Sequence, residues 1–383
     1  MATLRLLAVA AFCCCCEAYM APIHCPSPHR TRAVVALAKT KQKPKGKGKA
    51  VRATKISTRG FGSAPKSAGA KLLDEPKYAA LYEWLNTSPL TNLKKVAVGE
   101  FDGGLRGVMA LQDIAPGEEI VAIPATLAID LGTDSSDPLP PARRLLAERR
   151  ADADEGEYAA YWAVLPQPDS PDLCTPDFFS DAELDMLQWP PLIDETRRRA
   201  AVLQKVLSAD SGGDEHDGMR MLQWGVWTVL SRVLTVVDPV DPAGHKLLIP
   251  FIDMFNHKGG TKHYLTGRTD GMLRVVAGAP VRAGEQIFIK YGIDATSNAE
   301  FVAHYGFYDP SPTAAAADAD LVRQQAAAAG GGGAAALDAL RQTSLEEDEA
   351  ALAAEPPPPY QQQLALRLRL GLKRAAERQN LLP

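Results

Sequence analysis

Apolar and polar residues alternate over short distances in two parts of the chain, and this pattern predicts short strands. The first part, between residues 96 and 123, has three apolar runs separated by turns at Asp102–Gly104 and Ile114–Glu119. The second part has two runs rich in β-branched and aromatic residues. The predicted strands are Val96–Val98, Leu105–Ala110, Ile120–Ile123, Met272–Ala277 and Gln286–Tyr291. Short strands with tight turns argue against a doubly wound parallel sheet.

Other segments space their apolar residues as an α-helix does. The predicted helices are Tyr78–Leu85, Pro141–Arg150, Asp152–Leu165, Glu195–Leu207 and Met221–Leu234. The last is the most apolar, and one face carries Trp224, Trp227, Leu230 and Leu234. Ser180, with Glu183 three residues later, predicts a capping box at another helix start, and Ser211–Asp217 is predicted to be a loop. We therefore predict an α+β fold in which a helical insertion, about 133–220, interrupts a strand-rich domain.

The C-terminal residues differ in composition. Ala314–Ala336 is rich in alanine and glycine and is predicted to be a flexible linker. Thr343, with Glu346 three residues later, predicts a capping box that opens a helix over Leu345–Ala354. Leu364–Leu372 alternates leucine and arginine, which suits a strand. Its leucines at 364, 368 and 372 also share a helical face, and the alanines and glutamate that follow favour a helix.

Charge is distributed unevenly. Residues 1–60 contain twelve Lys and Arg residues and one acidic residue, Glu17; the remaining 30 Lys and Arg against 45 Asp and Glu give residues 61–383 a formal net charge of −15. An acidic body argues against a nucleic-acid partner. Cys174 is the one cysteine beyond residue 60, so the body can form neither an internal disulfide nor a cysteine-rich zinc site. The seven histidines are scattered along the chain, and we expect no metal.

The N-terminus has the composition of a targeting leader. Residues 3–16 have the apolar core of a signal peptide, too short to span a membrane. Residues 19–60 are basic, contain no acidic residue and resemble a transit peptide. Together, residues 1–60 predict a two-part plastid address, and we expect no membrane association of the mature protein. A secretory or mitochondrial signal remains an alternative, as does a nuclear address at Lys39–Lys55.

Two aromatic-polar clusters carry the candidate chemistry. The first is Asp253-Met-Phe-Asn-His257; the second begins at Tyr291-Gly and ends at Tyr305-Gly-Phe307. In this order, after the glycine-rich stretch Gly103–Pro124, they resemble the motifs of SET-domain protein methyltransferases of the Rubisco large-subunit lysine methyltransferase-like branch. No P-loop, H-E-x-x-H, G-x-S-x-G or strand-linked G-x-G-x-x-G competes with this interpretation.

The resemblance implies a domain organisation. Residues 71–310 would form a SET domain with the insertion at about 133–220, and residues 311–383 would form the linker and a reduced C-terminal helical substrate-binding lobe. It also implies a pseudoknot, in which the segment Tyr291–Phe307 passes beneath an earlier loop. The same resemblance implies S-adenosylmethionine as methyl donor and a protein lysine as acceptor. We expect a monomer.

Two tyrosines are the candidate catalytic residues, Tyr291 and Tyr305. A free lysine has a pKa of about 10.4, so neutralising it near pH ~8 costs about 3 kcal/mol. A tyrosine-lined apolar channel beside a sulfonium would offset much of that cost by desolvation and like-charge repulsion. In the family, the tyrosine matching Tyr291 lies nearest the transferred methyl group. Taken singly, each would be an ordinary half-buried aromatic residue of a sheet or turn.

The resemblance also implies a set of cofactor-binding residues. Backbone contacts would come from the glycine turn, a carboxylate contact from the arginine at the end of the apolar helix, and contacts to the amino-acid and adenine moieties from the two clusters. The set is Gly104, Leu105, Arg106, Arg232, Asp253, Asn256, His257 and Phe307. Residue by residue, simpler interpretations exist: Arg232 suits a helix C-terminus, Asn256 suits a turn, and Phe307 suits a core. Asp253 is expected to brace the turn, and His257 is not expected to be a general base.

Three functions stay open from the sequence. The first is a plastid protein-lysine methyltransferase, for which the resemblance suggests Rubisco large subunit or fructose-bisphosphate aldolase as substrate, with histidine methylation as a variant. The second is an inactive SET-like binding module. The third is chromatin modification, which would need a nuclear address and which the acidic body disfavours.

Overall fold

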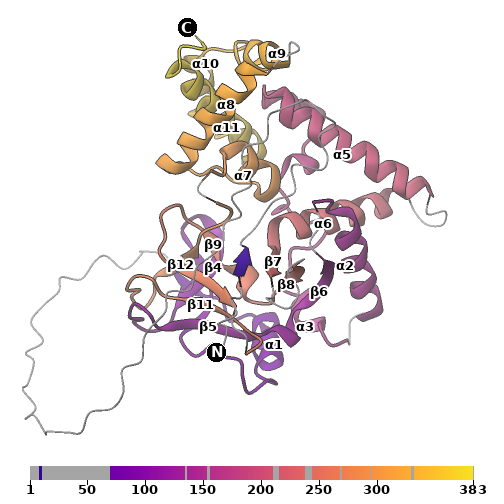
Figure 1. The fold of residues 1–383 in the computed structure, drawn as a ribbon, viewed down its shortest axis with the longest axis vertical. Helices are drawn as coiled ribbons and strands as arrows, with labels where there is room; N and C mark the ends of the chain where they lie inside the picture. The colour runs from indigo at the N-terminus through magenta and orange to yellow at the C-terminus, as the bar shows by residue number, and fades with distance from the viewer. Residues whose placement is uncertain are drawn as a thin grey trace, which may run out of the picture.

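The computed structural model of the protein describes residues 8–10, 70–133, 136–152, 156–209, 215–237, 244–267, 270–293, 295–328 and 332–382. Figure 1 shows the sheets and helices α1–α3 and α6 in one part of the molecule and helices α7–α11 in another, with α5 running alongside. Of the predicted leader, only Ala8–Ala10 (β1) is described. The predicted loop Ser211–Asp217 lies outside the described residues as far as residue 214, and a helix begins at Glu215.

A five-stranded sheet brings the two ends of the strand-rich region together. Its order is β2 (Lys71–Leu72), β3 (Val96–Phe101), β4 (Leu105–Ala110), β12 (Gln286–Ile289) and β9 (Asn256–His257). β3 and β4 form a hairpin closed by the 3₁₀ turn η1 (Asp102–Gly104). β12 pairs antiparallel with β4 and parallel with β9. The pairing of β12 with β4 and β9 therefore places the glycine-rich hairpin and the end of the Asp253–His257 cluster on either side of β12. The second cluster begins at Tyr291, two residues after β12 ends.

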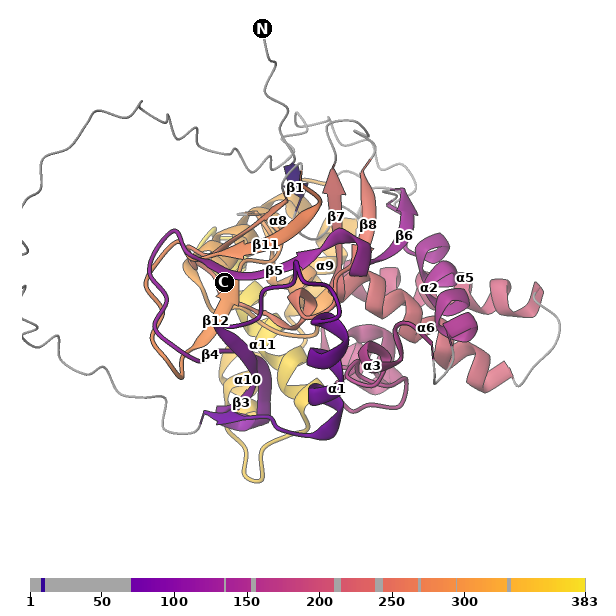
Figure 2. The same ribbon diagram turned by 90° about the horizontal axis from the view of Figure 1, so that it is seen from below.

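Two smaller sheets complete the strand-rich part, seen from below in Figure 2. One is antiparallel, with the order β10 (Tyr264–Gly267), β11 (Met272–Val276) and β5 (Glu119–Pro124). The other has the order β1, β7 (Val233–Val237), β8 (His245–Leu248) and β6 (Ile129–Thr133). Further 3₁₀ turns are η2 (Ala125–Leu127), η3 (Pro176–Phe178) and η4 (Ile252–Met254). All five predicted strands are present.

The helical insertion lies between β6 and β7, after the single helix α1 (Pro76–Leu85). It contains α2 (Leu139–Asp152), α3 (Ala159–Trp162), α4 (Asp181–Met186), α5 (Pro190–Ala209) and α6 (Glu215–Arg232). The Ser180–Glu183 capping box is confirmed. The helix predicted over Asp152–Leu165 is wrong for most of its length, because the Asp152 carboxylate accepts from the Tyr158 N–H and the Trp162 indole, each at 2.9 Å, and holds a turn there.

In the described residues after Tyr291, helices are the regular elements of the C-terminal part, joined by short loops. It contains α7 (Asn298–Tyr305), α8 (Pro312–Ala327), α9 (Gly332–Leu340), α10 (Leu345–Leu352) and α11 (Tyr360–Glu377). The flexible linker predicted over Ala314–Ala336 is therefore wrong, since most of it lies in α8 and α9. Alanine is the strongest helix former, the Ser311 side chain caps α8, and Ala314, Ala317 and Val322 are buried.

Two smaller predictions for this part have different outcomes. The capping box near residue 343 lies one position later than predicted, with Ser344 as N-cap and Glu347 as its partner. The ambiguous segment Leu364–Leu372 is helical, within α11, and its leucines 364, 368 and 372 are buried. Of the two alternatives, strand and helix, the helix is correct, because its leucine face packs into the smaller hydrophobic cluster.

Two hydrophobic clusters form the interior. The larger is built from the sheets with α1, α2, α3 and α6; Trp224, Trp227 and Leu230 of α6 are buried in it, as is Leu234 of β7. The smaller is built from α4, the start of α5, and α7, α8, α9 and α11. The C-terminal lobe therefore shares its core with insertion helices that precede it by more than 100 residues. None of the helices in the described ranges is long and apolar enough to cross a bilayer.

Candidate functional site

A cavity of about 680 Å³ lies where the β3–β4 hairpin, the end of α6, the η4 turn, Tyr291 and the end of α7 meet. All ten residues predicted from the sequence to act at one site line this cavity: Gly104, Leu105, Arg106, Arg232, Asp253, Asn256, His257, Tyr291, Tyr305 and Phe307. Residues from four separated stretches of chain therefore meet at one place. Their individual roles in binding and chemistry stay predictions.

The hairpin wall depends on glycines for two different reasons. Gly103 and Gly104 have φ angles of 79° and 77°, and a Cβ at either would meet nothing within 4 Å, so these positions need glycine for conformation. A Cβ on Gly107 would lie 2.1 Å from the Gln286 side chain, so that position needs glycine for space. Because of this close approach, the Asn256 amide reaches the hairpin and donates to the Arg106 carbonyl at 2.7 Å.

Arg106 and Arg232 are both anchored by the protein. Arg106 Nη1 donates to the Val164 carbonyl at 2.6 Å, which ties the hairpin to the insertion. Arg232, the last residue of α6, donates from Nη1 to the Asp253 carboxylate at 3.0 Å and to the Asp253 carbonyl at 3.2 Å. Burial raises the pKa of the Asp253 carboxyl above its ordinary value, and the two guanidinium groups oppose that rise. The structure thus places Asp253 as the brace of Arg232.

Two donor atoms of this wall have no hydrogen-bond partner among the described residues. They are Nε of Arg232 and the indole nitrogen of Trp227, both buried, and both residues line the cavity. The Arg232 guanidinium also lies 5.3 Å from the Trp227 ring. Because both atoms are enclosed by protein, as is the unpartnered Oδ1 of Asp253, they do not face the cavity themselves. The Arg232 side chain is 14% exposed and lines the cavity, so its positive charge makes this end suited to an anionic group such as a carboxylate.

His257 is held at both ring nitrogens. Nδ1 accepts from the Tyr291 N–H at 2.9 Å, and Nε2 lies 3.2 Å from the Asp309 carboxylate. Burial lowers the pKa of His257. An imidazole with both nitrogens engaged by the protein is poorly placed to exchange protons with a ligand. That His257 is not a general base stays a prediction.

The aromatic end of the cavity is built around Tyr291. The Tyr291 hydroxyl donates to the Phe255 carbonyl, and its ring centroid is 5.0 Å from that of Tyr305. Burial raises the pKa of Tyr291 well above its ordinary range, so the hydroxyl stays protonated. Phe307 stacks on His257 with the ring centroids 5.4 Å apart. The wall facing the cavity is thus aromatic and neutral.

Several functional candidates were missed by the sequence reasoning. Asp309 contacts His257, and Cys174 and Tyr360 line the cavity and both donate to the Gly306 carbonyl, at 3.4 and 3.0 Å. Burial raises the pKa of the Cys174 thiol to about 11. Only Asp309 had a usable signal, since it follows the Tyr305–Phe307 motif by two residues; the contacts of Cys174 and Tyr360 bridge more than 50 positions.

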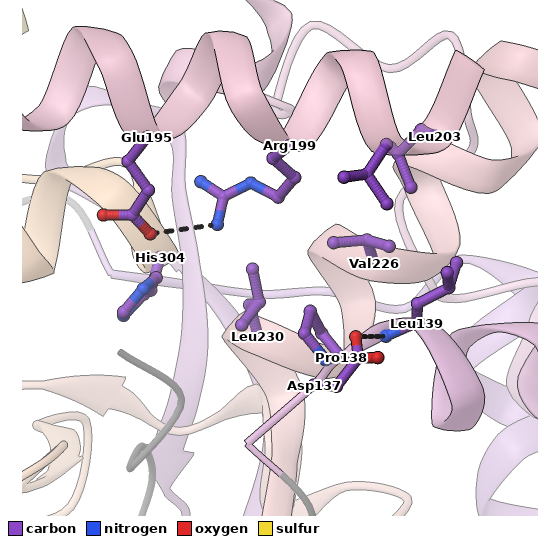
Figure 3. A pocket seen from close by; sticks show the side chains of 10 residues that line it. Asp137, Pro138, Leu139, Glu195, Arg199, Leu203, Val226, Leu230 and His304 are labelled. Atoms are coloured by element: carbon purple, nitrogen blue, oxygen red, sulfur yellow. Dashed lines mark hydrogen bonds and ion pairs between the residues drawn. The ribbon is translucent and has the colours of Figure 1, made fainter. Parts of the chain in front are cut away.

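A second cavity, of about 20 Å³, lies between α5, α6 and α7 (Figure 3). Arg199 reaches into it from α5 beside Glu195, while Leu230 and His304 come from α6 and α7. Its volume is enough for about one water molecule and no larger ligand. Within the described ranges, no three His, Cys, Asp or Glu side chains are grouped so that they could hold a metal ion.

Comparisons with known proteins extend this description. No model of a known protein family matches the chain. Similar solved structures include the SET domain of LSMT bound to lysine and AdoHcy and Rubisco LSMT bound to AdoMet; both align with a TM-score of 0.59 over 79% of this chain and 90% of the other, at 16% and 17% identity. The α+β fold is therefore the SET-domain fold. Whether the segment Tyr291–Phe307 threads beneath an earlier loop stays a prediction.

The curated relatives carry a different name from the solved structures: they are histidine methyltransferases. They include the actin-histidine N-methyltransferases of Drosophila melanogaster, 25% identical over 300 residues, and of Homo sapiens, 30% identical over 161 residues. These alignments cover 63% and 39% of this chain. The aligned part of this chain spans 54% of the length of the Drosophila protein and 27% of that of the human protein.

Proposed function

We propose that this protein is an S-adenosylmethionine-dependent methyltransferase that acts on a nitrogen of a protein side chain. The observation that carries the proposal is the meeting of all ten predicted residues around one cavity of about 680 Å³ in a SET fold. The structural neighbours carry AdoMet or AdoHcy, and the curated relatives are protein methyltransferases by name. A shared fold and a site of matching composition support the same activity here.

The residues present fit the proposed cofactor. Its amino-acid carboxylate would lie at the Arg232 guanidinium, which lines the cavity. Its adenine would lie beside Phe307 and His257, which already stack on each other. Asn256 joins the two binding segments through the Arg106 carbonyl. When bound, S-adenosylmethionine supplies an electrophilic methyl group on a cationic sulfur.

The aromatic end would prepare the acceptor nitrogen. An amine entering between Tyr291 and Tyr305 leaves water for an apolar wall, which lowers its pKa and favours the neutral nucleophile. The Tyr291 hydroxyl donates to the Phe255 carbonyl. A tyrosine oxygen can accept as well as donate, so that of Tyr291 would accept from the acceptor N–H and fix its direction. Most of the catalysis would then be positioning and exclusion of water.

We propose lysine as the acceptor, and histidine as a second candidate. Lysine is supported by neighbours that bind lysine or methyllysine in a similar fold. Histidine is supported by the names of the curated relatives. The leader-like residues 1–60 support a plastid location, and a stromal substrate such as Rubisco large subunit or aldolase is the corresponding proposal.

The decisive experiment is transfer of labelled methyl groups. The purified chain is incubated with stromal protein and S-adenosylmethionine labelled on its methyl group, and the product is hydrolysed and separated for methyllysine and methylhistidine. Label in methyllysine supports the first proposal, and label in methylhistidine supports the second. The pH dependence of kcat/KM, which reports the free substrate, separates them again. For a lysine acceptor kcat/KM rises towards the pKa of the free amine, about 10.4, whereas a free imidazole is already neutral above about pH 7.

Calorimetric titration with S-adenosylmethionine tests the cofactor independently. We expect micromolar binding that is lost in Asn256→Ala, since that change frees the hairpin from the η4 turn. Without binding to the wild-type chain, in the presence or absence of stromal protein, the inactive binding module would become the better interpretation.

The location is tested separately by fusing residues 1–60 to a fluorescent protein. The proposal expects fluorescence in the plastid. Fluorescence in the nucleus would contradict it and would favour a chromatin substrate.

A further inference from the structure

Asp309 lies outside both sequence clusters, yet it links the C-terminal helices to the candidate reaction centre. Its N–H donates at 2.7 Å to the side-chain oxygen of Asn298, a fully buried residue. Its Oδ1 accepts from the Ser311 N–H at 3.0 Å. Its Oδ2 accepts from the Ser311 hydroxyl at 2.6 Å and lies 3.2 Å from Nε2 of His257. The carboxylate is therefore fixed in place before any ligand binds.

The groups around His257 determine which nitrogen of its ring carries the proton. The Tyr291 N–H can only donate, so Nδ1, which it faces at 2.9 Å, must be the unprotonated nitrogen. The proton of the neutral ring is then on Nε2, where the Asp309 carboxylate accepts it. If Nδ1 carried the proton, its N–H and the Tyr291 N–H would face each other as two donors, and the contact with Tyr291 would break.

We propose that Asp309 is a positioning residue for methyl transfer: it holds His257 in the tautomer that accepts from the Tyr291 N–H and so places the Tyr291 side chain. This inference rests on the proposed function. Two further contacts support it. The His257 ring lies 5.4 Å from the Tyr291 ring and 5.4 Å from the Phe307 ring, so a change in its orientation reaches both sides of the cavity.

Asp309→Asn is the informative substitution because it keeps the shape of the side chain and replaces one acceptor oxygen with an NH₂ donor. The amide oxygen must occupy the Oδ1 position, where the Ser311 N–H needs an acceptor; the Ser311 hydroxyl at Oδ2 can reverse its role. The amide NH₂ therefore faces Nε2 of His257. The ring then has donors on both sides and one acceptor, and either the contact with Tyr291 or the contact with residue 309 is lost.

Ser311→Ala is the matched control. It removes one hydrogen bond to the same Asp309 oxygen and the N-cap of α8, but it leaves both contacts of His257 intact. We expect it to lower the melting temperature without changing the histidine tautomer or turnover. A merely structural role of Asp309 would make the two substitutions behave alike.

The test combines nitrogen NMR of histidine-labelled protein with turnover. In the wild type we expect the signals of a neutral His257 protonated on Nε2, and in Asp309→Asn a shift of both ring nitrogens and of the Tyr291 amide proton. Turnover should fall by about 10-fold or more, as misplacing a reacting group does, while the KM for the protein substrate stays within about twofold. Unchanged ring and amide signals would overturn the proposal, as would shifted signals with unchanged turnover.

Failure of this inference is distinguishable from failure of the proposed function. The NMR signals report the link from Asp309 to Tyr291 whether or not the protein transfers methyl groups. A wild type without turnover, but with the expected tautomer and its loss in Asp309→Asn, would keep the positioning network and would reject its role in this reaction.

Discussion

The two ends of the cavity are built on opposite principles. At one end, Arg232 and Asp253 form a buried ion pair, and Arg232 brings a positive charge to the cavity wall. At the other end, Tyr291, Tyr305 and Phe307 present neutral rings. The first end is suited to an anionic group, whereas the second disfavours charge. Under the proposed function, binding of the cofactor and preparation of the acceptor would therefore be separable properties of this site.

The ends also differ in what supports them. The charged end belongs to the larger core, since Trp227 and Met254 are buried in it. The aromatic end lies between the two cores: Tyr291 and Tyr305 pack against the larger one, whereas α7, which carries Tyr305, contributes Ala299, Val302 and Ala303 to the smaller one. Substitutions at the charged end should therefore lower the stability of the larger core and the affinity for the proposed cofactor. Substitutions at the aromatic end should lower turnover and can also affect both cores.

The largest expected effect comes from Arg232→Ala at the charged end. It leaves the Asp253 carboxylate, whose side chain is 0% exposed, buried without its partner, which costs about 3–5 kcal/mol of stability. Cofactor affinity should fall about 10–100-fold, the value of a hydrogen bond to a charged group. Urea unfolding and calorimetry measure the two effects.

Arg232→Met combined with Asp253→Asn is the control for that experiment. It removes the unpaired charge, so stability should largely return while the affinity for cofactor does not. Recovery of both properties would show that Arg232 only supports the fold.

The second prediction concerns the aromatic end. Tyr291→Phe keeps the ring and removes the hydroxyl that contacts Phe255, so turnover should fall by roughly 10²-fold or more while cofactor affinity changes little. Radiometric turnover and calorimetry measure this separation. Tyr264→Phe, at an exposed tyrosine, serves as the control and should change neither. Wild-type turnover of Tyr291→Phe would remove Tyr291 from the mechanism.

The third prediction tests the lobe behind the aromatic end through pH. Burial raises the pKa of Asp318 from its ordinary 3.8 to about 6. Below about pH 3 the group is mostly protonated in both folded and unfolded chains. As the pH rises from there to above 6, the unfolded chain ionises first, and about 2–3 kcal/mol of stability is lost.

Comparison with Asp318→Asn isolates this contribution. Between pH 4 and pH 7, the wild type should lose about 2–3 kcal/mol of unfolding free energy relative to the variant, which has no carboxyl group at this position. Asp318 accepts from both the N–H and the side-chain amide of Asn298, so the variant also loses one hydrogen bond. That loss lowers the stability of the variant by an amount that does not depend on pH. A difference that does not change with pH would contradict the raised pKa.

The smallest expected effect compares two glycines with similar backbone angles. Gly306 has φ 72° and a Cβ there would lie 2.8 Å from the Cys174 sulfur, whereas Gly260 has φ 77° and open space. Both alanine substitutions carry left-handed strain of about 1–2 kcal/mol. Gly306→Ala should cost about 1–2 kcal/mol more because of crowding, and it should raise the KM for the protein substrate, since residue 306 follows Tyr305. Equal melting temperatures would show that the contact relaxes.

The candidate site was largely predictable because its chemistry lies in short motifs. Asp253 to His257 and Tyr291 to Phe307 carry their residue types in a fixed order, and the glycines of the hairpin mark a turn whatever surrounds them. Cys174 and Tyr360 were missed because their partner, the Gly306 carbonyl, lies more than 50 positions away along the chain. Asp309 had a local signal, since it follows the Tyr305–Phe307 motif by two residues, but its contact with His257 spans 52 positions. No local pattern encodes such contacts.

The sequence by itself determined five of the strands, most of the helices before residue 233 and ten of the residues that line the cavity, since periodicity, capping residues and turn glycines act over a few positions. Only the tertiary structure decided that the alanine-rich segment after Ser311 is helical, because packing against α11 stabilises a helix there. Only the tertiary structure decided that the lobe shares its core with α4 and α5 and that Asp309 reaches His257. These outcomes depend on which surfaces meet after folding, and burial of apolar area between distant segments is not written in any one of them.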